Sequence, residues 1–415
     1  MAEKLLIVHG YSDGSTSFTG LRDFFIQKGG YKESHTHFVD YTSMDDGTTY
    51  RDLADKLDTD YRSHFGSDRV DVVCHSTGAL VVRAWLVLRN ERSRRRAGEK
   101  GVLLPCPVER LICFAPANFG SDLALLGQSF LSKFRTTFFN SHSHDEDRFE
   151  TGKALLQGLE PASPFQWELS MYDLHGQNTY FSPKQRADQR CYPFVLSAGT
   201  VYTGLQAKLI KERAKPGTDG TVRIPGTGLN TRLCTLDFPD DQEAKLLWYD
   251  EAKFEHIPFA IFAGFNHGSI IDPSAPGFLA EDGPGTLALQ ALTVNSNERY
   301  KEVYDLFKKA MESNYSRTEG DDRRCFQQFF FKLRDDVDLP VPDYYVDFHV
   351  VQRDGTPNEE LTVVFDEYFK ASFYRHSVDP SHRVMLVDCS KLEEFRDLLR
   401  QQGSRLMIEI NGVSA

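Results

Sequence analysis

Apolar and polar residues follow two different patterns along the first 120 residues. Short apolar runs typical of buried strands cover residues 5–8, 37–41, 70–74 and 108–115. Between them, apolar positions recur at helical spacing over 18–28 and 49–65, and residues 78–90 are apolar almost all round, as a buried helix is. Alternating strands and helices predict a parallel sheet with right-handed crossovers.

The pattern changes twice after residue 120. Residues 121–190 combine helix-like pieces, polar clusters and several prolines without a clear strand, which indicates an inserted cap or lid. Strand patterns return at 192–198, 233–238 and 259–263, and 285–313 reads as helix. From about residue 325, short alternating runs predict an appended antiparallel β-sandwich. These strand-like runs are FQQFFFKL, YYVDFHVVQ, LTVVFDEYF (361–369), KASFYRH, RVMLVD and RLMIEING.

Length fits two domains, which we expect at 1–315, with 121–190 as its insertion, and at 316–415. Hydrophobic residues make up 40% and charged residues 26%, as in ordinary globular proteins. The formal net charge of -12 argues against nucleic-acid binding and disfavours permanent attachment to anionic membranes, while it is compatible with transient contact with a lipid surface.

Targeting signals and cysteine usage suggest a location. The apolar run at 5–8 is too short for a signal-peptide core, and no apolar stretch approaches the roughly 18 residues of a membrane-spanning helix. The seven cysteines are scattered, without a CxxC pair. We therefore expect reduced thiols and a cytoplasmic protein, with export by a route without a cleavable signal left open.

A serine stands at the junction between a buried strand and a buried helix. In VDVVCHSTGALVVRAWL, Ser76 follows the strand at once and Gly78 comes two residues later. A sharp strand–serine–helix turn exposes the hydroxyl beside helix N–H groups, which suits a nucleophile. Cys74 stands where such turns usually have glycine, but its side chain is small. The alternative is that Ser76 only caps the helix.

A serine nucleophile needs a base, and the base needs an orienting carboxylate. Asp219 lies in a glycine-rich turn at 215–222, and His267 lies just past the strand at 259–263. Both are expected at carboxyl ends of strands, where sites gather in open α/β sheets. The alternatives are an ordinary Asp-Gly turn and a structural loop histidine. Competing acids and bases are Asp237, Asp240, Asp241, His256 and His175.

Two backbone N–H groups are candidates for an oxyanion hole. Thr77 follows the serine, and Tyr11 follows the His-Gly pair after the first strand. Each such donor lowers a reaction barrier by roughly 3 kcal/mol. In the inserted segment, Phe130, Phe134 and Phe138 form an aromatic stripe that either packs a lid helix or binds an acyl chain.

No cofactor and no metal site are predicted. The segment 142–147 (HSHDED) has metal-type side chains, but no ligand spacing supports a site, so a solvated turn is favoured. Asp272 is the nearest carboxylate downstream of His267, without a partner set for a cation.

Several motifs together resemble the lipase branch of the α/β-hydrolases, which includes bacterial triacylglycerol lipases and inositol-deacylase-like lipases. They are VHGY at 8–11, CHSTG at 74–78, APANFGSDLA at 115–124, LEPASPF at 159–165, TDGTV at 218–222 and NHG at 266–268. The resemblance covers roughly residues 4–275 and leaves out the C-terminal segment. It implies an α/β-hydrolase sheet with a cap, and a triad of Ser76, Asp219 and His267. Cys74 in place of glycine departs from the pattern.

The expected function is that of a serine lipase or esterase, with phospholipase activity included, which cleaves lipid or other acyl esters through an acyl-enzyme. The partner is then a small-molecule lipid or acyl ester; the sequence does not predict an oligomeric state. Two alternatives stay open: a thioesterase or amidase on the same scaffold, and a non-catalytic interaction protein that retains the fold. The C-terminal unit has three open roles, namely lipid binding, partner recognition and shielding of the first unit.

Overall fold

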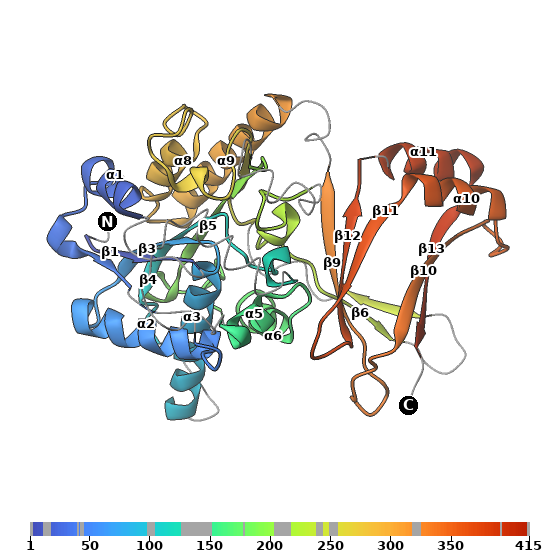
Figure 1. The fold of residues 1–415 in the computed structure, drawn as a ribbon, viewed down its shortest axis with the longest axis horizontal. Coiled ribbons are helices and arrows are strands. Elements are labelled where there is room, and N and C mark those ends of the chain that lie inside the picture. Colours follow the sequence, from blue (N-terminus) through green and yellow to red (C-terminus); the bar gives the residue numbers. More distant parts are fainter. Residues whose placement is uncertain are drawn as a thin grey trace.

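A parallel sheet forms the centre of the first unit (Figure 1). The computed structural model describes residues 3–10, 18–39, 41, 45–97, 104–125, 152–176, 179–202, 217–237, 244–248, 256–317, 325–390 and 392–412. The sheet strands are β1 (Leu5–Val8), β2 (Thr36–Phe38), β3 (Val70–His75), β4 (Val108–Phe114), β5 (Tyr192–Ala198) and β8 (Phe259–Phe262). They lie in the order β2-β1-β3-β4-β5-β8, and every neighbouring pair is parallel. The predicted α/β sheet is confirmed.

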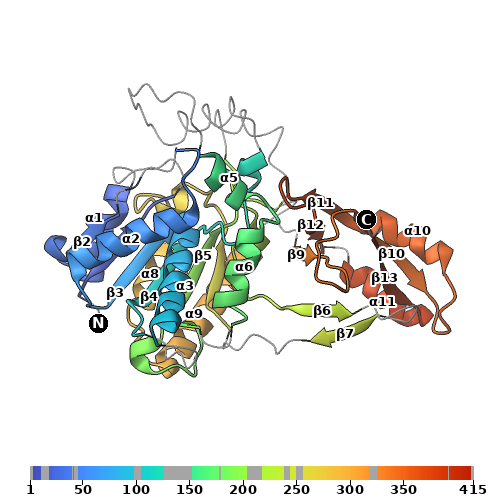
Figure 2. The same ribbon diagram turned by 90° about the horizontal axis from the view of Figure 1, so that it is seen from below.

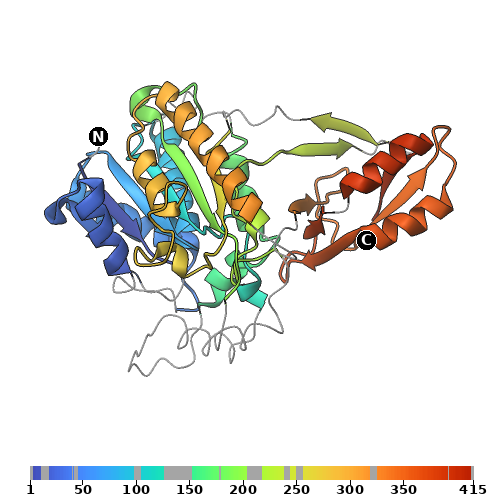
Figure 3. The same ribbon diagram turned by 90° about the horizontal axis from the view of Figure 1, so that it is seen from above.

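Helices cover both faces of this sheet (Figures 2 and 3). They are α1 (Thr19–Gly29), α2 (Tyr50–Phe65), α3 (Gly78–Ala97), α8 (Pro284–Ala291) and α9 (Asn297–Arg317). Successive strand residues point to opposite faces of a sheet. In β1, Leu5 and Ile7 accordingly share a core with α1, α8 and α9, whereas Leu6 and Val8 share one with α2 and α3.

Two helices replace the single helix predicted over 285–313. Helix α8 ends at Ala291 and α9 begins at Asn297. The hydroxyl of Thr293 donates to the carbonyl of Gln290 at 2.7 Å, and the hydroxyl of Ser296 accepts the N–H of Arg299 at 3.2 Å. Hydroxyl groups that bond to nearby backbone favour helix ends over helix interiors, which explains the break.

In the segment between β4 and β5, the described residues form short helices joined by turns and irregular stretches. It contains η3 (Asp122–Leu125), α5 (Lys153–Leu159), α6 (Pro164–Asp173) and η4 (Ala187–Gln189), where η marks a 3-10 helix. Leu155 of α5 and Leu169 of α6 join the core that α3 lines. Residues 126–151 lie outside the described part of the chain, so a cap at 121–190 stays a prediction.

A hairpin takes the place of the strand predicted at 233–238. Strand β6 (Cys234–Asp237) pairs antiparallel with β7 (Lys245–Trp248), which the sequence did not predict, and neither strand belongs to the parallel sheet. Figures 2 and 3 show this hairpin extending from the first unit alongside the C-terminal unit.

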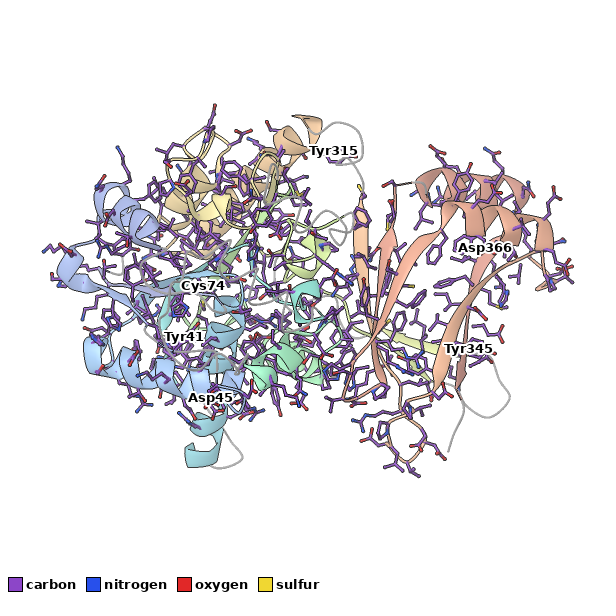
Figure 4. The ribbon with its side chains drawn as sticks, viewed as in Figure 1. Tyr41, Asp45, Cys74, Tyr315, Tyr345 and Asp366 are labelled. Atoms are coloured by element: carbon purple, nitrogen blue, oxygen red, sulfur yellow. The ribbon has the colours of Figure 1, made fainter. Side chains whose placement is uncertain are left out.

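The C-terminal unit contains two antiparallel sheets, as expected. Its strands are β9 (Phe326–Lys332), β10 (Tyr344–Val351), β11 (Lys370–Arg375), β12 (His382–Asp388) and β13 (Arg405–Gly412). One sheet has the order β11-β12-β9 and the other pairs β10 with β13. Figure 4 shows Tyr345 and Asp366 in this unit, well away from Cys74 in the parallel-sheet unit.

Two helices accompany these strands, and one corrects the sequence prediction. The run 361–369, read as a strand, lies mainly in helix α10 (Glu359–Tyr368); α11 (Leu392–Gln402) was not predicted. The side chain of Asn358 accepts the N–H of Leu361 at 3.1 Å and so caps α10. Leu361 and Phe365, four residues apart, are both buried. The cap and this helical spacing outweigh the β-propensity of the Val and Phe residues.

The division into 1–315 and 316–415 stays a prediction, although β8 is the last strand of the parallel sheet and the next strand, β9, belongs to an antiparallel sheet. Within the ranges that the structure describes, no helix combines the length and the apolar character needed to cross a bilayer.

Candidate active site

Ser76 lies in the turn between β3 and α3, in a backbone conformation that residues other than glycine rarely adopt. Its φ is 55°, in the left-handed region. The turn is held on both sides, because the N–H of Ser76 donates to the carbonyl of Phe114 at 3.1 Å and its carbonyl accepts the N–H of Ala117 at 3.1 Å. Strain of this kind persists where surrounding structure enforces it, often at functional sites.

Two glycines that pack close to Ser76, Gly78 and Gly10, have no room for a side chain. A Cβ atom on Gly78 would lie 2.7 Å from the carbonyl oxygens of Val8 and His9, so helix α3 can approach β1 this closely only with glycine. A Cβ on Gly10 would lie 2.9 Å from the Cβ of Ser76. Cys74 is fully buried, and its Sγ lies 3.4 Å from that of Cys113 on β4. A thiol therefore fits the core where glycine was expected.

A hydrogen-bonded chain joins Ser76, His267 and Asp219. The Oγ of Ser76 lies 3.0 Å from Nε2 of His267, and Nδ1 of His267 lies 2.7 Å from Oδ2 of Asp219. Ser76 is 8% exposed, His267 1% and Asp219 0%, so the interactions are largely shielded from water. With the proton on Nδ1 donated to the carboxylate, Nε2 is free to accept the hydroxyl proton of Ser76.

Backbone N–H groups fix the other oxygen of Asp219. Its Oδ1 accepts the N–H of Thr221 at 2.9 Å and that of Val222 at 2.7 Å, while its carbonyl accepts the N–H of His267 at 3.2 Å. Gly220, with φ of 98°, makes the tight turn possible. Both the side chain and the main chain of Asp219 therefore hold His267.

His75 is a site residue that sequence reasoning missed. It is 2% exposed, and its Nε2 lies 2.9 Å from the carbonyl of His267, to which it donates. Burial, with a smaller contribution from His267, lowers the pKa of His75 well below its usual value, so the ring is neutral. The signal was present in CHSTG, because a histidine ending a buried strand needs a polar partner.

The structure brings together Ser76, Thr77, Asp219 and His267. The alternative acids and bases that it describes make contacts elsewhere. Thr77 precedes α3 directly. Asp237 is exposed on β6, His256 stacks on Tyr304, and His175 contacts the hydroxyl of Thr231. Several sequence predictions lie outside the described residues: Tyr11, Phe130, Phe134, Phe138, Asp240, Asp241 and the segment 142–147.

Asp272 has a local role. Its carboxylate accepts the hydroxyl of Ser274 at 2.7 Å and the N–H of that residue at 2.9 Å. Among the described residues, no group of three or more His, Cys, Asp or Glu side chains is arranged to hold a metal ion.

Comparisons with known proteins extend these observations. The phospholipase PlaB from Legionella pneumophila has a similar structure, with a TM-score of 0.78, 20% sequence identity, and coverage of 99% of this chain and 85% of that chain. Its complex with thio-NAD gives a TM-score of 0.76 at 19% identity, with the same coverage. The similarity therefore extends to the C-terminal unit. A search of curated proteins found no match.

One family is shown by the sequence itself. The model of the alpha/beta hydrolase family matches residues 5–245, which is more than half of the chain. The parallel sheet with helices on both faces and the serine turn after β3 agree with that match. This chain belongs to the alpha/beta hydrolase family.

Proposed function

We propose that this protein is a serine hydrolase that cleaves carboxylic esters through an acyl-enzyme. The hydrogen-bonded chain from Ser76 through His267 to Asp219 carries this proposal, with its distances of 3.0 and 2.7 Å. Its geometry matches what nucleophilic catalysis requires of a hydroxyl, a base and an orienting carboxylate.

In the first half-reaction, the Oγ of Ser76 attacks the ester carbonyl carbon while its proton moves to Nε2 of His267. The carbonyl electron pair moves onto oxygen and gives a tetrahedral oxyanion. When the pair returns, the bond to the alkoxy oxygen breaks, and that oxygen takes the proton from Nε2. The alcohol leaves, and the acyl group stays on Ser76.

In the second half-reaction, a water molecule gives its proton to Nε2 of His267 and attacks the acyl carbon. The new tetrahedral intermediate collapses, Oγ of Ser76 recovers the proton, and the carboxylic acid leaves. Asp219 keeps the proton of His267 on Nδ1 and stabilises the imidazolium formed in each half-reaction.

The N–H groups of Thr77 and Tyr11 are proposed to bind the oxyanion. Thr77 directly precedes α3, where helix N–H groups and the helix dipole favour negative charge. Tyr11 enters this proposal from its sequence position after β1. Each donor is expected to lower the barrier by about 3 kcal/mol.

Lipid or other acyl esters are the proposed substrate class. The fold is shared over 99% of the chain with a protein whose name describes a phospholipase. The sequence motifs resemble those of lipases, and the substrate is proposed to enter beneath the segment 121–190. Phe130, Phe134 and Phe138 are proposed to contact the acyl chain.

A substrate panel tests the proposal. We expect purified protein to hydrolyse p-nitrophenyl esters of short and long acyl chains, and diacyl phospholipids in mixed micelles, faster than matched thioesters and anilides. Ser76→Ala should abolish turnover, whereas Ser63→Ala, an exposed serine in α2, should leave it unchanged. Preferred cleavage of thioesters or anilides would contradict the ester assignment, and turnover by Ser76→Ala at the wild-type rate would contradict the mechanism.

A further inference from the structure

The loop that carries Asp219 is a tight turn, and other parts of the chain pack against it on two sides. Within it, the N–H of Asp219 donates to the carbonyl of Val222 at 3.1 Å, and that of Ile224 donates to the carbonyl of Gly217 at 2.9 Å. The loop ends in the 3-10 helix η5 (Ile224–Gly226). We call residues 217–226 the acid loop.

The segment after β4 holds one side of the acid loop. The hydroxyl of Ser121 donates to the carbonyl of Thr221 at 2.5 Å, and the N–H of Phe119 donates to the carbonyl of Gly226 at 2.9 Å. The guanidinium of Arg223 pairs with the carboxylate of Asp122 at 2.6 Å. These contacts come from the parallel-sheet unit itself.

Strands of the C-terminal unit hold the other side. A Cβ on Gly217 would lie 2.6 Å from the ring of Phe326 on β9, so this ring packs directly on the loop backbone. The side chain of Gln328, also on β9, lies 3.1 Å from the Cβ position of Gly226 and donates to the carbonyl of Phe119 at 3.0 Å. Figure 1 shows β9 as the C-terminal strand nearest the first unit.

Arg223 joins both sides. It is 1% exposed, and its guanidinium lies 3.8 Å from the ring centroid of Tyr374 on β11 while it pairs with Asp122. A buried guanidinium over an aromatic face is attracted by the ring quadrupole, and this attraction grows when water is excluded. Arg223 lies four residues after Asp219, and its backbone forms an isolated antiparallel β-bridge with Thr218 across the turn.

We propose that the C-terminal sheet β11-β12-β9 is a positioning element for catalysis. Tyr374 contacts Arg223 of the acid loop, and Gln328 binds Phe119, whose N–H donates to Gly226 of that loop, so that Asp219 keeps His267 oriented toward Ser76. This inference rests on the proposed function. In this role the C-terminal unit affects the rate of the reaction, in addition to any binding role.

Catalytic geometry is sensitive enough for such a contact to matter. A misplacement of about 1 Å caused by a distant substitution can lower a rate by roughly 100-fold. Asp219 touches His267 through one 2.7 Å contact to its ring and one 3.2 Å contact to its backbone. A small shift of the acid loop therefore changes the orientation of the base without removing any reacting group.

Neighbouring residues on the same strands supply matched controls. Gln327 is exposed whereas Gln328 is partly buried on the opposite face of β9, and Phe373 is 52% exposed beside Tyr374 on β11. We expect the double variant Gln328→Ala/Tyr374→Leu to lower kcat for p-nitrophenyl butyrate roughly 10- to 100-fold with KM within about twofold. Gln327→Ala/Phe373→Leu should keep the wild-type kcat. Tyr374→Phe, which keeps the ring, should retain most of the activity that Tyr374→Leu loses.

The same substitutions in an Asp219→Asn background show whether the effect runs through Asp219. If it does, the double variant should lower the residual kcat of Asp219→Asn by less than about twofold, because coupled residues are not additive. An equal loss in both backgrounds, or an unchanged kcat in the folded double variant, would overturn the positioning role. If wild type has no turnover, or Asp219→Asn matches wild type, the proposed function fails and this inference fails with it.

Discussion

At the scale of single residues, His75 supports the candidate site from outside the chain of Ser76, His267 and Asp219. His75 donates from Nε2 to the carbonyl of His267 at 2.9 Å, and the two rings have centroids 4.6 Å apart. A protonated His75 would place a positive charge beside the proposed base. Its lowered pKa, which results mainly from burial, keeps this neighbour neutral.

Replacing His75 should therefore weaken both stability and catalysis. We expect His75→Phe to lower the free energy of unfolding by about 1–3 kcal/mol, because the buried carbonyl of His267 loses its donor. Its kcat should fall roughly tenfold at unchanged KM, since a base that is held less firmly is misoriented more often. Steady-state kinetics and urea unfolding measure both effects. His256→Phe, at an exposed ring that stacks on Tyr304, is the control, and an unchanged kcat in His75→Phe would contradict the positioning role.

The sequence predicted Ser76, Asp219 and His267 as site candidates because each follows a strand in the chain order that this fold uses, and the structure brings the three side chains into contact. It did not identify His75 or Arg223, because their partners are distant in sequence. The carbonyl bound by His75 is 192 residues away, and the ring beneath Arg223 belongs to another unit. Periodicity and local motifs carry no information about such contacts.

At the scale of elements, the position of α3 against β1 depends on Gly78. We expect Gly78→Ala to cost about 1–3 kcal/mol of stability, because the added methyl would lie 2.7 Å from two backbone carbonyl oxygens. The displaced helix should also lower kcat by moving Ser76 and Thr77. Gly228→Ala is the matched control, since the nearest atom to its Cβ position is 3.9 Å away. Thermal melts and ester hydrolysis test the pair, and equal behaviour of the two variants would refute the steric explanation.

Elements with a strong local pattern were predicted well, and those defined by caps or partners were not. The inner strands of the parallel sheet, β1, β3, β4 and β5, are largely apolar runs buried on both faces, so their signal is local. The run 361–369 was misread because β-branched and aromatic residues also pack on a helix once Asn358 caps it. Strand β7 is defined by its pairing with β6, and no pattern within residues 245–248 predicts this pairing.

At the scale of the whole molecule, one of the contacts between the two units involves a buried histidine. His382, at the start of β12, is 3% exposed and contacts Trp167 of α6 edge to face, with ring centroids 6.2 Å apart. Burial is the main cause that lowers its pKa to about 4, Lys332 adds to the shift, and Asp379 opposes it.

This lowered pKa predicts a loss of stability in acid. Between pH about 6.5 and about 4, the unfolded chain binds a proton at His382 that the folded chain does not, so the free energy of unfolding falls as pH falls. Urea unfolding followed by tryptophan fluorescence should show a smaller decrease over this window for His382→Gln than for wild type. His349→Gln, at a less buried histidine on β10, is the control. An identical pH dependence in wild type and His382→Gln would contradict the assignment.

In the proposed mechanism, Ser76 is the nucleophile, His267 activates it, and Asp219 orients His267. Labelling with a fluorophosphonate, followed by intact-mass measurement and peptide mapping, tests it most directly. We expect one adduct per wild-type chain, located on Ser76, with no adduct on Ser76→Ala and slower labelling of Asp219→Asn. An unlabelled wild type, or equal labelling of Ser76→Ala, would contradict it.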